Sequence, residues 1–145
     1  MATWEGPFRL RDLLERSMDD FQPWPKEETG VYVVSRLPWE REPTTASDIL
    51  YVGSNSQNPE LFLRRVGDLI IDMLGFWGHQ VNSGHHAGGQ TLWLHCYENK
   101  INPLDLFLGW QHRIPCARCA ELESYLALSP RLAKKTPARC HEHQS

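Results

Sequence analysis

The chain has 145 residues, of which 41% are hydrophobic, and its formal net charge is −3 at pH 7. This size and composition predict a single domain over residues 1–145 with a real core, and they exclude a disordered or fibrous protein. The acidic balance argues against a protein that coats nucleic acid by bulk charge alone, because such proteins carry a large positive excess.

The first half of the chain predicts a helix, two strands and a second helix. Residues 8–21 place apolar side chains at helical spacing between charges, which predicts an amphipathic helix. The β-branched and aromatic runs 30–34 and 49–53 predict two buried strands, joined as a hairpin by a long connection. A second amphipathic helix is expected over residues 59–75, because Pro59 suits a first helical turn.

The second half predicts one more strand and two more helices. Residues 76–90 are rich in glycine and histidine, as loops often are, and the run 91–97 predicts a third strand. A short helix over residues 102–112 is expected to begin at Asn102, and a last helix spans 116–128. Strands and helices do not alternate regularly, so their order favours an α+β fold.

Cellular location and partners follow from the charge and the apolar runs. No run approaches the roughly 20 apolar residues of a membrane span, and no secretory signal is evident, so we expect a cytoplasmic protein without a membrane partner. Residues 113–139 carry six bases against two acids, so this stretch, with Lys134 and Lys135, is a candidate DNA contact or only a solvated surface. The acidic N-terminal helix is a candidate surface for binding a protein partner.

The predicted hairpin carries a resemblance to a known family. Residues 30–32 read Gly-Val-Tyr and residues 51–53 read Tyr-Val-Gly; a helix with an arginine and a later helix with a glutamate follow. In this order the residues resemble the GIY-YIG nuclease superfamily over a core of residues 30–133, with 1–25 as a helical extension. The resemblance implies a small central antiparallel sheet flanked by helices. It also implies an endonuclease that hydrolyses DNA phosphodiester bonds with one divalent cation.

The resemblance assigns roles to particular residues. Tyr32 and Tyr51 would position or activate the attacking water, and Gly53 would close the strand end beside the substrate. Arg65 is preferred to Arg64 as the catalytic arginine because a valine follows it, and Arg64 is then a second contact to the substrate. The planar fork of an arginine suits a phosphate group.

The metal-binding carboxylate would lie on the last predicted helix. Glu121 is preferred to Glu123, because family members commonly carry a proline nine residues later and Pro130 stands there. A carboxylate suits a hard, oxygen-preferring ion, which implies Mg²⁺ or Mn²⁺. One histidine of His79, His85 and His86 is a candidate to share the tyrosines' role as base, with His85 preferred, although histidines in such a loop are more often surface residues.

Three departures from the family pattern leave other functions open. The connection between Tyr32 and Tyr51 is longer than the usual one, Ser54 stands where many relatives have lysine, and Ala133 replaces an expected asparagine. A second hypothesis is therefore a catalytically weakened nucleic-acid-binding or protein-interaction module that keeps the fold. A third is a domain whose tyrosines only pack a core.

Cysteine and histidine spacing near the C-terminus predicts a structural zinc site. A C-x2-C pair precedes a C-x2-H pair by twenty residues, a spacing that fits a tetrahedral four-ligand Zn²⁺ site. The candidate ligands are Cys116, Cys119, Cys140 and His143. We expect a zinc knuckle over residues 116–143, with His141 as an alternative to His143 and Cys96 as a further candidate. The alternative is a tail with unliganded thiols.

Overall fold

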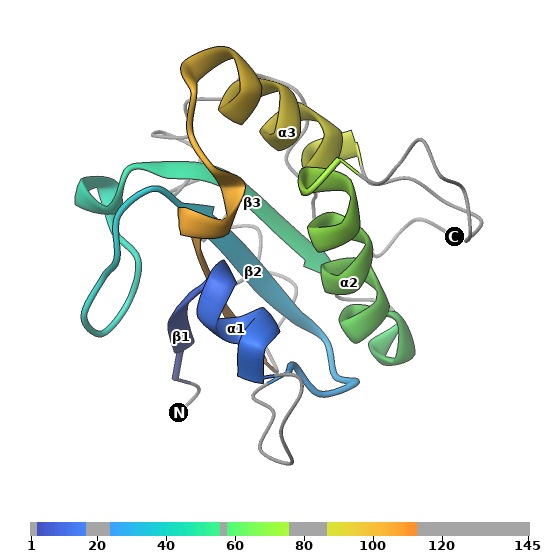
Figure 1. Cartoon of the computed structure of the whole chain (residues 1–145). Helices are drawn as coiled ribbons and strands as arrows, with labels where there is room; N and C mark the ends of the chain where they lie inside the picture. The colour runs from blue at the N-terminus through green and yellow to red at the C-terminus, as the bar shows by residue number, and fades with distance from the viewer. Residues whose placement is uncertain (1–2, 17–23, 56–57, 76–86, 113–145) are drawn as a thin grey trace.

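The computed structural model describes residues 3–16, 24–55, 58–75 and 87–112. Within them, a four-stranded antiparallel sheet carries three α-helices on one face (Figure 1). An α+β fold with a small antiparallel sheet is thereby confirmed. No helix in this part of the chain combines the length and the apolar character needed to cross a bilayer.

In the sheet, the last strand in chain order lies between the first two. The strands are β1 Glu5–Arg9, β2 Gly30–Ser35, β3 Ile49–Asn55 and β4 Phe107–His112. They lie in the order β1, β4, β2, β3, and each neighbouring pair is antiparallel. Every residue of β2 and β3 is buried, as is the middle of β4 from Leu108 to Trp110.

The predicted hairpin is confirmed, because β2 pairs directly with β3. Its connection contains a short 3-10 helix, η1 Thr45–Ser47, capped by Thr44. Trp39 from the same connection packs with valines of β2 on the sheet face opposite the helices. A Cβ at Gly109 of β4 would lie 2.8 Å from the indole Cη2 of Trp39, so glycine there admits the close approach.

The second predicted helix is confirmed, although it ends at Met73 and not at Gly75. Pro59 occupies the first turn of η2 Pro59–Leu61, which Asn58 caps, and α2 Phe62–Met73 continues from it. Gly75 follows with a φ of 91°, a left-handed conformation that suits glycine after a helix. The apolar side chains of α2 pack on the sheet, as their helical spacing predicts.

The N-terminal prediction is partly wrong, because a strand precedes the helix. β1 includes Phe8, which was expected to begin the helix, and α1 spans Leu10–Arg16. Phe8 packs against Trp110 of β4, with ring centroids 5.2 Å apart. This pairing across the chain overrides the local helical spacing. Leu13 of α1 is fully buried, and residues 17–21 lie outside the described residues.

The third predicted strand is wrong, because residues 91–97 belong to the helix α3 Ala87–Asn99. The expected loop over 76–90 likewise gives way to this helix from residue 87 onward, and residues 76–86 lie outside the described residues. Leu92 and Cys96 are both buried, whereas Leu94 is 46% exposed. Burial at a spacing of four residues is helical, whereas a strand would bury alternate residues.

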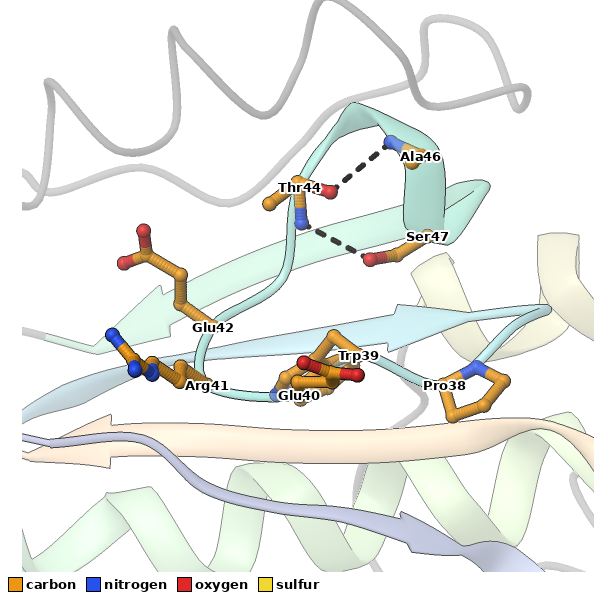
Figure 2. A pocket seen from close by; sticks show the side chains of 8 residues that line it. All are labelled: Pro38, Trp39, Glu40, Arg41, Glu42, Thr44, Ala46 and Ser47. Atoms are coloured by element: carbon orange, nitrogen blue, oxygen red, sulfur yellow. Dashed lines mark hydrogen bonds between the residues drawn. The ribbon is translucent and has the colours of Figure 1, made fainter.

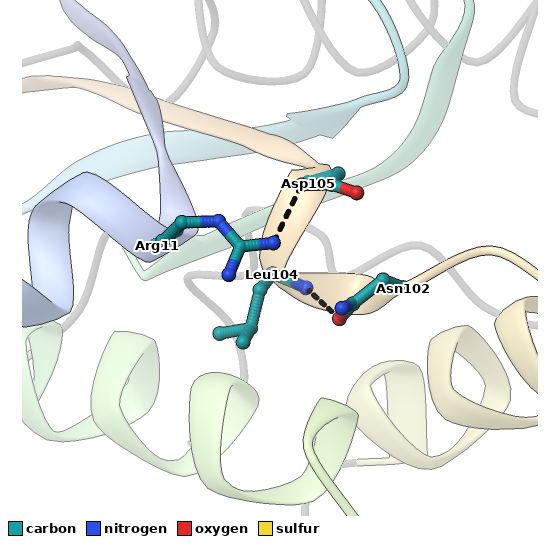
Figure 3. A network of polar contacts seen from close by, with 4 residues as sticks. All are labelled: Arg11, Asn102, Leu104 and Asp105. Carbon is teal, nitrogen blue, oxygen red and sulfur yellow. Dashed lines mark hydrogen bonds and ion pairs between the residues drawn. The ribbon is translucent and has the colours of Figure 1, made fainter.

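The helix predicted over 102–112 is wrong beyond its first turn. Asn102 caps as expected, since its side-chain oxygen accepts the Leu104 N–H at 3.0 Å, but the 3-10 helix η4 spans only Pro103–Asp105. Asp105 pairs with Arg11 of α1 at 2.8 Å (Figure 3). The chain then enters β4, whose residues fill the place between β1 and β2.

Candidate active site

Tyr32 and Tyr51 point to the same face of the sheet. Tyr32 lies opposite Gly53, and Tyr51 lies opposite Val34, two residues further along the same strand pair. Because successive side chains of a strand alternate between faces, both tyrosines project toward the helices. Their ring centroids are 6.3 Å apart, with 39° between the ring planes.

Two glycines fit closely against these rings. A Cβ at Gly53 would lie 2.6 Å from the hydroxyl oxygen of Tyr32, and a Cβ at Gly88 would lie 2.9 Å from that of Tyr51. Such distances leave no room for a side chain at either position. Gly53, expected beside the substrate, therefore lies against the Tyr32 ring. Gly88 brings the first turn of α3 against Tyr51, a contact that the sequence analysis missed.

The two tyrosines differ in burial. Tyr32 is fully buried, and Phe62 of α2 meets it edge-on with ring centroids 5.8 Å apart. The side chain of Tyr51 is also buried, but 9% of it is exposed. Both belong to the core cluster between sheet and helices. Of the pair, Tyr51 is the one whose side chain is closer to solvent.

Arg65 and Arg64 occupy different environments on α2. Arg64 is exposed, whereas Arg65 is half-buried. The Nε of Arg65 is buried and has no hydrogen-bond partner among the described residues. Arg65 follows Phe62 by three residues, so these two side chains are neighbours on the helix surface, and Phe62 in turn contacts Tyr32. A half-buried guanidinium with a spare donor suits an anionic group.

Carboxylates accompany these arginines along α2. Burial raises the pKa of Asp68 above its ordinary value; Asp72 acts in the same direction, and the cations of Arg64 and Arg65 oppose the rise. Asp72 is 2% exposed, and a Cβ at Gly89 would lie 2.7 Å from its Cβ. The start of α3 therefore packs between Tyr51 and Asp72. The only sequence signal was that Asp72 interrupts an apolar run.

Ser54 does not stand on the tyrosine face. It lies opposite Val31 in the pairing of β2 with β3, and Val31 belongs to the cluster on the other side of the sheet. A lysine at position 54 would therefore start from the face away from Tyr32 and Tyr51. The serine does not remove a cation from beside these rings.

Several predicted site residues lie outside the described residues. They are Glu121, Glu123, His79, His85, His86, Ala133, Lys134, Lys135 and the zinc candidates Cys116, Cys119, Cys140, His141 and His143. Among the residues that are described, no group of three or more His, Cys, Asp or Glu is arranged to hold a metal ion. Cys96 is a buried free thiol, and burial raises its pKa to about 11, so it stays protonated at neutral pH.

A cavity of about 340 Å³ lies in the connection between β2 and β3 (Figure 2). Its lining consists of Pro38, Trp39, Glu40, Arg41, Glu42, Thr44, Ala46 and Ser47. Thr44 Oγ1 accepts the Ala46 N–H at 3.2 Å, and Ser47 Oγ accepts the Thr44 N–H at 3.0 Å, so both hydroxyl oxygens support the loop itself. Trp39 packs on the face away from the tyrosines, which separates this cavity from the candidate site.

Comparisons with known proteins find no relative of this chain. No protein family, no curated protein and no solved structure matches the chain.

Proposed function

We propose that the chain is a metal-dependent endonuclease of the GIY-YIG type, acting on DNA phosphodiester bonds. One observation carries the proposal: Tyr32 and Tyr51 share the helix-covered face of the sheet, with their ring centroids 6.3 Å apart. Helix α2, one of those that cover this face, carries Arg65, whose buried Nε has no hydrogen-bond partner within the described part of the chain. Two phenols and a guanidinium are groups that phosphodiester hydrolysis can use.

Each residue has a distinct task in this proposal. Tyr51, the more exposed of the pair, orients the attacking water through its hydroxyl group. Tyr32, packed between Gly53 and Phe62, acts as a positioning residue that fixes the Tyr51 ring. Arg65 binds the phosphate through its planar guanidinium, which a lysine could not replace with the same geometry. Arg64, Lys134 and Lys135 add cationic contacts to DNA.

Glu121 would hold the catalytic Mg²⁺ or Mn²⁺. A carboxylate together with waters and a substrate phosphate is an ordinary ligand set for Mg²⁺, and a glutamate supplies oxygen donors of the right kind. When bound, the cation neutralises charge that develops on the phosphate. His85 is the further candidate base in this proposal.

The burial of the tyrosines favours one alternative. Tyr32 has no exposed surface and Tyr51 has little, so packing alone accounts for both. A module that binds nucleic acid or a protein without hydrolysing anything would keep these residues for the core.

A cleavage assay with matched acid variants tests the proposal. Purified protein is incubated with labelled DNA and Mg²⁺ or Mn²⁺, beside Glu121→Gln and Glu123→Gln. We expect the wild type and Glu123→Gln to cut and Glu121→Gln to bind without cutting. Loss of cutting in Glu123→Gln alone would instead assign the metal-binding role to Glu123. Binding without cutting by the wild type would support the non-catalytic module.

We also propose the zinc knuckle formed by Cys116, Cys119, Cys140 and His143. The support is the chemistry of the donor set, because thiolate and imidazole are the usual ligands of structural zinc. Elemental analysis should give one zinc per chain, and Cys119→Ser should lower that content. A wild-type zinc content near zero would remove the knuckle.

A further inference from the structure

His112, the last residue of β4, is enclosed by segments from different parts of the chain. Its side chain is 10% exposed. Phe62 of α2 meets the imidazole edge-on, with ring centroids 5.2 Å apart. From the segment that leads into β2, the Lys26 N–H donates to Nε2 at 3.2 Å. The ring therefore ties the backbone of Lys26 to the end of the sheet.

This hydrogen bond fixes the form of the ring. A nitrogen that accepts carries no proton, so neutral His112 holds its proton on Nδ1. Nδ1 is buried and has no partner at full hydrogen-bond geometry among the described groups, although the Thr29 backbone lies near enough to favour the charged ring. The nearest carboxylate oxygen, Glu28 Oε1, lies 4.0 Å away, which is too far for a hydrogen bond but close enough to attract a cation.

The charges that face His112 are of both signs. Glu5 of β1 and Glu28 favour the imidazolium, as does the Thr29 backbone, whereas Lys26 opposes it. From α2 the neighbour is the apolar Phe62. Burial outweighs the attraction of the two carboxylates and lowers the pKa of His112 below its ordinary value of 6.5, so the ring is neutral at pH 7.

We propose that His112 is a pH-sensitive latch, which holds the Lys26 backbone at the end of the sheet when neutral and releases the Lys26 N–H when protonated. A proton from solvent would bind at Nε2 and occupy the lone pair that accepts this N–H. Two N–H groups would then face each other, while the imidazolium is drawn toward Glu28 and Glu5. No other covalent bond changes.

The latch adjoins the candidate active site. Phe62 contacts His112 on one side and Tyr32 on the other, with ring centroid distances of 5.2 Å and 5.8 Å. Residues 24–29 also lead directly into β2, which carries Tyr32. The latch nevertheless stands independently of DNA cleavage, because its geometry involves no group assigned to hydrolysis.

An NMR titration of the full chain tests the latch. The Lys26 amide and the His112 ring are followed from about pH 8 to pH 4.5. We expect His112 to titrate below its ordinary value of 6.5. The Lys26 amide signal should shift with the same midpoint. His112→Gln keeps an acceptor but cannot titrate there, so its Lys26 signal should not follow the transition. His95→Gln, on α3, should leave the transition unchanged.

Three results would overturn the latch: a His112 midpoint at or above its ordinary value, a Lys26 amide that ignores the His112 titration, or a transition that survives in His112→Gln. If His112→Gln does not fold, Glu28→Gln replaces it. Because Glu28 favours the charged ring, its loss should move both midpoints to lower pH. Unmoved midpoints in a folded Glu28→Gln protein would also contradict the latch.

Discussion

The backbone of Gly88 lies against the ring of Tyr51, so closely that a Cβ there would be 2.9 Å from the tyrosine hydroxyl oxygen. The next residue, Gly89, makes a similar approach to α2, where a Cβ would be 2.8 Å from the Leu69 carbonyl oxygen. Two successive glycines therefore join the start of α3 to the sheet and to α2. The position of Tyr51 depends on this junction.

Gly88→Ala should destabilise the protein, because the added methyl group collides with the Tyr51 ring. Overpacking of this kind costs about 1–3 kcal/mol of unfolding free energy. Gly67→Ala is the control, since its added Cβ would meet no atom within 4 Å apart from its chain neighbours and the backbone of its own helix, α2. It should stabilise by about 0.5–1 kcal/mol. Urea unfolding measures both, and equal effects would contradict the close contact.

A pair of leucine substitutions distinguishes the helix α3 from the strand that the sequence predicted. Leu92 is fully buried and Leu94 is 46% exposed, although a strand would place them on one face. Leu92→Ala should cost about 2–5 kcal/mol. Leu94→Ala should stay within about 0.5 kcal/mol. Similar losses in the two variants, measured by thermal and urea unfolding, would argue for the strand.

The errors in the sequence analysis have a common physical cause. The segment 91–97 is short, and its central run 92–94 is continuously apolar, so its periodicity does not separate a helix from a strand. Packing decides the matter, because Gly88 and Gly89 let the segment approach Tyr51 and α2 closely. The β4 segment likewise forms a strand because β1 and β2 pair with it, and β1 lies about a hundred residues away.

The tyrosine pair was more predictable than its surroundings. Two short β-branched runs in sequence order form a hairpin by local pairing, which brings Tyr32 and Tyr51 to one face. The contacts of Gly88 with Tyr51 and of Gly89 with Asp72 join separate elements, and no local sequence pattern predicts them. The same holds for His112, whose partners Lys26 and Glu28 are distant in sequence.

Cys96 should resist alkylation in the folded protein. Burial raises the pKa of its thiol from 9.0 to about 11, so the reactive thiolate is scarce at pH 8. Iodoacetamide treatment followed by peptide mass spectrometry should label this residue in urea but not in buffer. Equal labelling in both conditions would contradict its burial.

The same shift gives Cys96 an effect on stability in alkaline solution. Above pH 9.0 the thiol ionises in the unfolded chain, whereas in the folded protein it stays protonated up to about pH 11. The unfolded state then binds fewer protons, so the free energy of unfolding falls as pH rises through this window. Cys96→Ala should show a shallower decline in urea unfolding across the same pH range. An identical decline would contradict the raised pKa.

Arg65→Lys should reduce DNA cleavage more than Arg64→Lys. The lysine keeps the charge but loses the buried Nε donor and the planar fork, so the single-turnover rate should fall about 100-fold. Arg64 is exposed, and its replacement should have little effect on the rate. The reverse order would assign the catalytic arginine to position 64.

The rate of Mg²⁺-dependent DNA cleavage by Tyr51→Phe, beside Tyr97→Phe, tests the central claim most directly. Tyr97 is 70% exposed on α3, so loss of its hydroxyl group should leave the rate unchanged. Loss of the Tyr51 hydroxyl group should slow cleavage about 100-fold or more while the fold is kept. Equal rates for the wild type and Tyr51→Phe would contradict the proposed role of the tyrosine pair.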